Sequence, residues 1–159
     1  MIRKLAGVLA AATALLAVSA GAASAAPAGN AALQQRVDSV LAAIPGGTQV
    51  SATEIRYDGL TVKFSTQSTA TVSKETSSLA LTCAYGHLCF TVNGNTNFDF
   101  VACKTWDLTN WLNTAPYINN QTTGTIARAY DNNWVQRWSS KAYDAGTANV
   151  NPWYHLTVC

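Results

Sequence analysis

The residues whose side chains can do chemistry gather in the second half of the chain. They are four cysteines and two histidines, namely Cys83, Cys89, Cys103, Cys159, His87 and His155. Thiols and imidazoles can hold a metal ion, and a thiol can also form a disulfide or act as a nucleophile beside a base. The spacing of these residues decides which of these chemistries the chain can support.

Two disulfides are the chemistry that the spacing favours. The sequence contains no C-x-x-C pair, and neither histidine has a partner at zinc-ligand spacing, so no metal site is expected. An even number of cysteines in an exported chain indicates disulfides, and four cysteines allow three pairings that sequence alone cannot separate. We prefer Cys83–Cys89, as a short clasp across the turn at Gly86, together with Cys103–Cys159, which would tie the last strand to the body.

Catalysis is not expected from the remaining polar residues. The acids of the same region are Asp99, Asp107, Asp131 and Asp144, with no glutamate among them. Glycosidase chemistry needs two carboxyl groups that meet across a bond, and a serine nucleophile needs a histidine base held beside it. The sequence also lacks a glycine-rich phosphate loop. We therefore expect a protein that is not an enzyme, with no catalytic or cofactor-binding residues and no cofactor.

Residues 1–25 have the pattern of a signal peptide. Arg3 and Lys4 precede an apolar run over residues 5–18, and the small residues 23–25 then match the A-x-A sequence that signal peptidase cleaves. The alternative is a membrane anchor, but the run is shorter than the roughly 20 residues that span a bilayer. We expect cleavage after Ala25, with Ala26 as the second choice, and a protein located outside the cell.

Removal of this leader leaves a chain without net charge. Two of the ten basic residues lie in the leader, so eight basic residues balance eight acidic ones in the rest. Nucleic acids and anionic membranes are bound through basic patches, so neither is expected as a partner after cleavage. About 130 residues remain, which is enough for one domain with a core. We expect it to be a monomer.

Residues 26–64 predict a small unit made of a helix and a β-hairpin. Apolar residues recur at helical spacing between a candidate N-cap at Asn30 and the Pro-Gly-Gly stop at residues 45–47, at Leu33, Val37, Val40, Leu41 and Ile44. The hairpin follows from Asp58-Gly59, a strong two-residue turn signal. Such a turn pairs Tyr57 with Leu60 and Ile55 with Val62, and so gives the hairpin one apolar face that can receive the helix.

Residues 65–82 predict a linker. Nine of the fourteen residues from 65 to 78 are Ser or Thr, with Lys74 and Glu75 as the only charges. Such a segment buries too little apolar surface to offset its ordering entropy. A strand near residues 69–73 remains an alternative.

Residues 83–159 predict an all-β body. Strand-like runs at 88–92, 98–103, 117–119, 125–130, 134–138 and 153–159 are separated by turn signals, with residues 106–111 expected in a loop or helical turn. A weak internal repeat agrees with this, and chance similarity of two β-hairpins is the alternative explanation of it. A shift of 38 residues places Gly86 on Gly124, Leu88 on Ile126, Val92 on Tyr130 and the 93–95 turn on residues 131–133.

An ordered set of motifs resembles a known family. The set consists of C-x5-C-F-x-V, an Asn-rich turn, Cys103, the run from Asp107-Leu108 to Trp111, and residues 119–124. It is similar to the secreted actinobacterial peptidase inhibitors with a βγ-crystallin-like double Greek key, the Streptomyces metalloproteinase inhibitor family. The resemblance covers residues 83–159 and, loosely, the unit before them. It implies a mainly β, double Greek-key sandwich and an extracellular protease as partner.

Some features of this family are missing. The crystallin hairpin motif places a glycine shortly after its second aromatic residue, whereas here Phe98 follows Phe90 at longer spacing and precedes Asp99. The segments nearest to a crystallin calcium site, 113–118 and 151–154, lack the required acids, amides and hydroxyls, so no calcium is expected. The reactive loop between two close cysteines has no counterpart, because Cys103 and Cys159 are far apart.

Two functions without catalysis follow. A proteinase inhibitor would use a rigid exposed loop, and the candidates are two Asn-rich turns, Asn93, Gly94 and Asn95 (with the segment extending to residue 97) and Asp131, Asn132 and Asn133. The alternative is a carbohydrate- or cell-wall-binding module that uses Trp106, Trp111, Trp134, Trp138 and Trp153. Several coplanar, exposed indoles would favour the second function, and buried indoles would weaken it.

Overall fold

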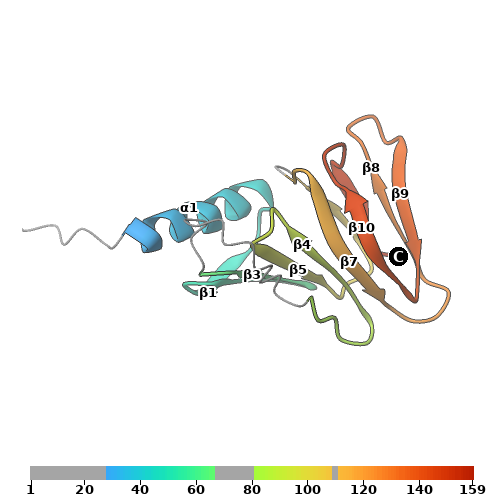
Figure 1. The fold of residues 1–159 in the computed structure, drawn as a ribbon, viewed down its shortest axis with the longest axis horizontal. Helices are drawn as coiled ribbons and strands as arrows, with labels where there is room; N and C mark the ends of the chain where they lie inside the picture. Colours follow the sequence, from blue (N-terminus) through green and yellow to red (C-terminus); the bar gives the residue numbers. More distant parts are fainter. Residues whose placement is uncertain (1–27, 67–80, 109–110) are drawn as a thin grey trace, which may run out of the picture.

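The chain is mainly β. The structure, a computed structural model, describes residues 28–66, 81–108 and 111–159. Within these ranges it contains one helix and eleven strands, and the strands form two antiparallel sheets (Figure 1). The expected signal peptide, most of the expected linker and the possible strand near residues 69–73 lie outside the described residues.

The larger sheet has seven strands in the order β1-β2-β3-β5-β4-β7-β10. Their bounds are β1 (Thr48–Ser51), β2 (Glu54–Tyr57), β3 (Leu60–Phe64), β4 (His87–Val92), β5 (Thr96–Phe100), β7 (Thr114–Asn120) and β10 (Asp144–Asn149). The smaller sheet has four strands in the order β6-β11-β8-β9. These strands are β6 (Thr105–Asp107), β8 (Ile126–Tyr130), β9 (Gln136–Lys141) and β11 (His155–Thr157).

The last eight strands form two interlocked sets of four. In each set the first two strands make a hairpin, β4–β5 and β8–β9, and the fourth strand returns to pair with the first. The third strand of each set belongs to the sheet that holds the other three strands of the opposite set. Strand β6 therefore pairs with β11, and β10 pairs with β7. Because each sheet needs a strand from the opposite set, the two halves must fold together.

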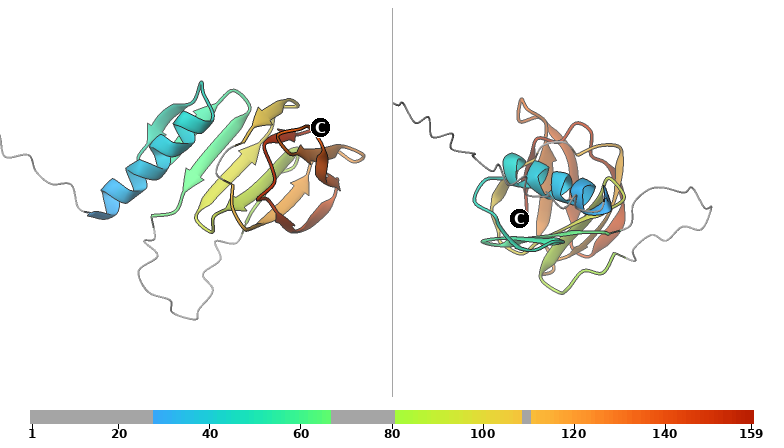
Figure 2. Two further views of the ribbon diagram at one scale, coloured as in Figure 1. Left: turned by 90° about the horizontal axis from the view of Figure 1, so that it is seen from above. Right: turned by 90° about the vertical axis from the view of Figure 1, so that its left-hand side faces the viewer.

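Helix α1 (Ala28–Ala43) covers one end of the larger sheet (Figures 1 and 2). Its buried residues Leu33 and Val37, with Ile44 just beyond its end, belong to the predicted apolar stripe. The helix ends before Pro45, as predicted, and Gly46 has a φ of 90° in the left-handed region that terminates helices. The predicted N-cap at Asn30 is wrong, because the helix already includes Ala28 and Asn30 lies inside its first turn.

The hairpin β2–β3 has the predicted register, with Tyr57 opposite Leu60 and Ile55 opposite Val62. Gly59 is required in its turn because its φ is +86° and because a Cβ there would collide with Ala102. Strand β3 also pairs along its whole length with β5, from Leu60 opposite Phe100 to Phe64 opposite Thr96. The N-terminal unit and the body therefore share one sheet and one core.

Several expected elements have different bounds. Strand β5 stops at Phe100 instead of continuing to Cys103, and β9 starts at Gln136, two residues later than expected. The segment expected as a loop or helical turn overlaps the short strand β6, which pairs with β11. Strands β1 and β10 were not predicted. Strand β10 reads Asp-Ala-Gly-Thr-Ala-Asn, which is poor in β-branched and aromatic residues, so only its pairing with β7 identifies it as a strand.

The core between the sheets is centred on Phe90, which is fully buried. Its ring lies 5.4–6.3 Å, centroid to centroid, from five other rings, those of Phe100, Trp111, Tyr117, Trp138 and Trp153. Aromatic pairs at these separations stabilise a core beyond the area they bury. These rings come from both sets of strands, so one aromatic cluster holds the two sheets together.

The internal repeat is visible in the structure with one difference. Gly86 and Gly124 precede β4 and β8 and both have positive φ values, 87° and 92°. The aligned residues Leu88 and Ile126 differ in burial, because Leu88 is buried and Ile126 is half-buried, and the buried positions of β8 are Ala127 and Ala129. Burial alternates along a strand with period two, so a shift of one residue moves the whole inward face.

Candidate partner-contact site

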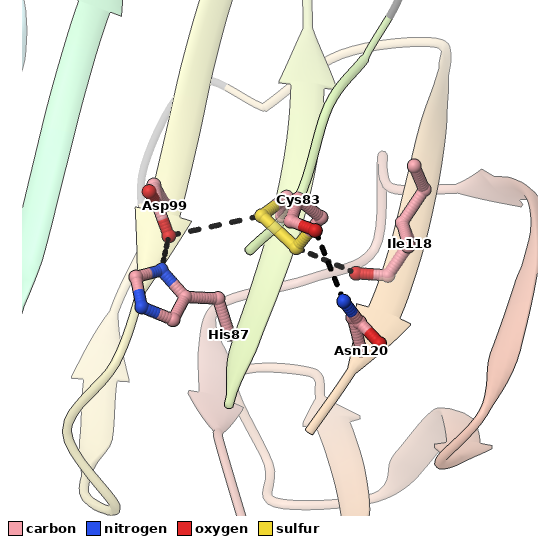
Figure 3. A network of polar contacts seen from close by, with 6 residues as sticks. Cys83, His87, Asp99, Ile118 and Asn120 are labelled. Atoms are coloured by element: carbon pink, nitrogen blue, oxygen red, sulfur yellow. Dashed lines mark hydrogen bonds and ion pairs between the residues drawn. A yellow bond between two sulfur atoms is a disulfide. The ribbon is translucent and has the colours of Figure 1, made fainter. Parts of the chain in front are cut away.

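The cysteines form two disulfides. The pairs are Cys83–Cys89 and Cys103–Cys159, with Cα–Cα separations of 5.7 and 5.3 Å, which suit a bridged pair. These are the pairs that we preferred among the three pairings that the sequence allows. Figure 3 shows the first bridge beside β4, where the Asn120 side-chain amide donates to the Cys83 carbonyl oxygen at 3.0 Å. All four cysteines are used, so none is left as a nucleophile.

Both histidines pair with carboxylates in separate parts of the molecule. The Nδ1 atom of His87 lies 2.5 Å from Asp99, next to the first disulfide (Figure 3). The Nδ1 atom of His155 lies 2.7 Å from Asp107 in the smaller sheet. Among the described residues, no group of His, Cys, Asp or Glu could hold a metal ion.

The other two acids of the body also have structural partners. The Asp144 carboxylate accepts hydrogen bonds from the Tyr117 hydroxyl at 2.8 Å and from the Ser140 hydroxyl at 2.9 Å. Burial, together with the Asp144 carboxylate, raises the pKa of Tyr117. Asp131 is bound within its own loop, as described below. Each of the four acids thus has a different partner.

The first predicted contact turn, residues 93–95, is a tight turn that joins β4 to β5. Asn93 and Gly94 have φ values of 53° and 69°, both in the left-handed region, and the pairing of Val92 with Thr96 leaves three residues in the loop. The Asn93 side chain accepts a hydrogen bond from the Leu112 amide at 3.2 Å, and the Asn95 carbonyl accepts one from the Ser65 amide at 2.9 Å. Asn93 and Gly94 are exposed but are small and polar.

The second predicted contact turn extends to residue 135, and we call residues 131–135 the Asp131 loop. One oxygen of the buried Asp131 carboxylate accepts hydrogen bonds from the backbone amides of Asn133 and Val135, both at 2.9 Å. The other oxygen accepts two from the Arg137 guanidinium, at 2.9 and 2.6 Å. The backbones of Asp131 and Val135, and of Trp134 and Asp131, are also bonded at 3.0 Å. The loop is therefore held from within.

These contacts lower the pKa of the Asp131 carboxyl. The largest cause is the hydrogen bond from the Val135 backbone amide, followed among the lowering contacts by the hydrogen bond from Arg137. Hydrogen bonds to the ionised form favour that form. Asp131 is therefore ionised at neutral pH, and its charge is part of what orders the loop.

The Asp131 loop presents an exposed indole. Trp134 has a φ of 60°, which is rare for a residue with a side chain, and 57% of its surface is exposed. One face of its ring stacks on His155, with centroids 4.0 Å apart and planes within 5° of each other. Tyr130 contacts it from the side at 5.6 Å. Two fixed neighbours therefore hold the indole in place.

Other exposed apolar side chains lie at the same end of the smaller sheet. Val135 and Tyr154 are 50% and 48% exposed. Tyr130, at the end of β8, lies opposite His155, at the start of β11, and the Tyr154 amide donates to the Tyr130 carbonyl at 2.8 Å. We refer to Trp134, Val135 and Tyr154 together as the Trp134 patch.

The other four indoles do not form an exposed row. Trp106, Trp111 and Trp153 are buried, and Trp138 is half-buried against Phe90 and Trp153. Their positions favour core packing over a flat sugar-binding platform. Trp134 alone among the five is mostly exposed.

Sequence reasoning identified residues 131–133 but not the residues that give the loop its surface. Trp134 was assigned to the return strand, and Val135, Tyr154 and His155 were not connected with the loop. An acid followed by two asparagines did signal a turn in which the carboxylate could bind backbone amides. No signal in the sequence indicated that Trp134 adopts a positive φ or that β11 brings His155 beneath it.

Comparisons with known proteins identify no relative. No protein-family model, no curated protein and no solved structure matches this chain. Among the described residues, no helix is both long and apolar enough to cross a membrane. The function must therefore be inferred from the geometry of the chain itself.

Proposed function

We propose that the protein is a secreted proteinase inhibitor with a βγ-crystallin-like double Greek key, and that its target is an extracellular metalloproteinase. The Asp131 loop binds the protease cleft as a rigid unit and is not turned over. The protein acts as a monomer, without a cofactor.

The strand order supports the double Greek key. In a Greek key the fourth strand returns to lie beside the first. Strand β7 pairs with β4, and β11 pairs with β8, so each set of four has this return. Two disulfides and a β-rich body are also consistent with an oxidising space outside the cell.

The observation that carries the inhibitor proposal is the Asp131 loop, which is ordered from within and yet presents a large apolar side chain. Binding by a mobile loop costs conformational entropy, and a preformed loop avoids most of this cost. Tryptophan residues are among the commonest energetic centres of protein interfaces. The Trp134 patch combines both properties in one place.

Residual protease activity tests the proposal. The protein is incubated at increasing molar ratio with a thermolysin-like metalloprotease and, separately, with subtilisin, and hydrolysis of a peptide substrate is then measured. We expect metalloprotease activity to fall towards zero near an equimolar ratio, with the inhibitor recovered intact. Full activity of both proteases at a large molar excess of the protein would reject the proposal.

Replacement of Trp134 by alanine tests the site. Loss of a central interface tryptophan costs about 2–4 kcal/mol, which corresponds to a rise in the inhibition constant of about 30- to 1,000-fold. The matched control is Tyr85→Ala, which removes a side chain that is 65% exposed on a different turn. Equal inhibition by both variants would mean that the protease binds elsewhere.

A carbohydrate- or cell-wall-binding module is the second candidate, and the exposed Trp134 is the one observation in its favour. A single indole held flat on His155 could stack on a sugar ring. Co-sedimentation with chitin, cellulose and peptidoglycan separates the two functions. Binding that is lost in Trp134→Ala, without any protease inhibition, would favour the module.

A further inference from the structure

A cavity of about 150 Å³ lies between α1 and the larger sheet, well apart in sequence from the Asp131 loop. Val40 and Ala43 of α1 form one wall, and Phe64 and Phe98 of β3 and β5 form another. Trp111, from the segment before β7, closes the side towards the smaller sheet. A cavity of about this volume can hold a group the size of a benzene ring.

The cavity follows from the way in which the wide sheet is covered. Helix α1 lies over the β1–β3 end of the sheet, and the smaller sheet packs over the other end (Figures 1 and 2). The cavity lining comes from α1, from the strands β3, β4 and β5 with the turn between β4 and β5, and from Trp111. The apolar lining with one charged side chain is typical of a pocket for a small ligand.

A guanidinium with spare hydrogen-bonding capacity lines this cavity. The Nη2 atom of Arg36 donates to the Ser65 carbonyl at 2.7 Å, and the guanidinium carbon lies 6.0 Å from the centre of the Phe64 ring. Its Nη1 atom is buried and has no hydrogen-bond partner among the described residues. A buried donor without a partner is costly, and more so when it is charged.

The charge around the cavity indicates the chemical class of ligand that it binds. No Asp or Glu is among the described residues that line it, and none of those residues forms an ion pair with Arg36. We propose that the cavity binds a small carboxylic acid whose apolar body, about the size of a phenyl ring, fills the space between Val40, Phe98 and Trp111. The carboxylate pairs with the Arg36 guanidinium, whose buried Nη1 must turn towards the cavity to donate to it. This site does not depend on the proposed protease inhibition.

Phenylacetate is a suitable probe, and benzyl alcohol is its uncharged counterpart. The full chain, exported by a host that removes any leader and forms both disulfides, is titrated with each compound and followed by ¹H–¹⁵N NMR. We expect phenylacetate to shift the signals of the Trp111 indole and of the Val92 and Thr96 amides. Arg36→Met keeps an apolar stem but removes the donor, and should weaken phenylacetate binding about tenfold or more, because a charged hydrogen bond is lost.

Two further variants make the result decisive. Arg56→Met removes an exposed guanidinium on β2 and should leave phenylacetate binding unchanged. Ala43→Leu fills the cavity without touching Arg36 and should abolish binding of both compounds. The proposal is overturned if phenylacetate causes no shifts around the cavity, or if Arg36→Met and the unaltered protein bind it equally. Protease inhibition, measured on the same samples, should be unaffected by Arg36→Met.

Discussion

The two repeated hairpins, β4–β5 and β8–β9, have similar backbones but opposite inward faces. Strand β4 turns Leu88, Phe90 and Val92 into the core, whereas β8 turns in Ala127 and Ala129, and all five are buried. Strand β4 thus supplies large side chains to the core and β8 supplies small ones, while β9 of the second hairpin adds Trp138. Large residues that face small ones allow two sheets to pack closely without voids.

Their turns differ in a second way. The turn at residues 93–95 is short, and two residues with positive φ suffice to close it. The Asp131 loop is longer, and a carboxylate orders it and leaves Trp134 exposed. The same place in the repeat therefore serves stability in one half and, as we propose, recognition in the other.

The largest expected loss of stability comes from shortening a large core side chain in the first hairpin. Phe90→Ala deletes the ring at the centre of the aromatic cluster and should lower the free energy of unfolding by about 3–5 kcal/mol. Urea or thermal denaturation followed by near-ultraviolet circular dichroism measures the loss. A change below about 1 kcal/mol would mean that the two sheets do not depend on this cluster.

Enlarging a small core side chain in the second hairpin should lower the free energy of unfolding by less. Ala129→Leu adds volume at a fully buried position of β8, and overpacking of this kind costs about 1–3 kcal/mol. The same denaturation experiment measures it, with Ala145→Leu as the control because Ala145 is exposed on β10. A neutral result for Ala129→Leu would contradict the close packing described here.

The two turns should respond oppositely to substitution. Asp131→Ala removes the groups that order its loop and should weaken protease inhibition by about tenfold, because the loop must then be ordered on binding. Gly94→Ala places a side chain at a φ of +69° with nothing within 4 Å, so strain alone should lower stability by about 1 kcal/mol. Inhibition by Gly94→Ala should be unchanged. Inhibition and denaturation are measured on both variants. Unchanged inhibition by Asp131→Ala, or weakened inhibition by Gly94→Ala, would contradict this prediction.

The smallest expected change in stability at neutral pH concerns Tyr57, in the hairpin that precedes both repeats. Burial raises the pKa of Tyr57 to about 12 from 10.0, and its hydroxyl has no partner among the described residues. The unfolded chain then ionises at lower pH than the folded one, so stability should fall as the pH rises from about 10 to 12. Tyr57→Phe should reduce this alkaline loss and change stability little at pH 7, as measured by denaturation at both pH values.

The sequence predicted the local elements best where one residue type leaves few choices. Asp58-Gly59 fixed the β2–β3 register, and Pro45 with the glycines after it ended α1. It predicted less where pairing partners decide, as in β10, whose small residues have little strand preference of their own. The candidate site was predicted only in part. Residues 131–133 were identified as a contact turn, but Trp134 was assigned to a strand.

The sequence by itself determined the mainly β class, the helix and the hairpin register, because these depend on periodicity and turn chemistry within a few residues. Tertiary structure decided that β3 joins β5, that the third strands exchange sheets, and that Trp134 lies on His155. The physical reason is distance along the chain. Contacts between residues far apart in sequence depend on which surfaces are buried together, and no short pattern of residues contains that information.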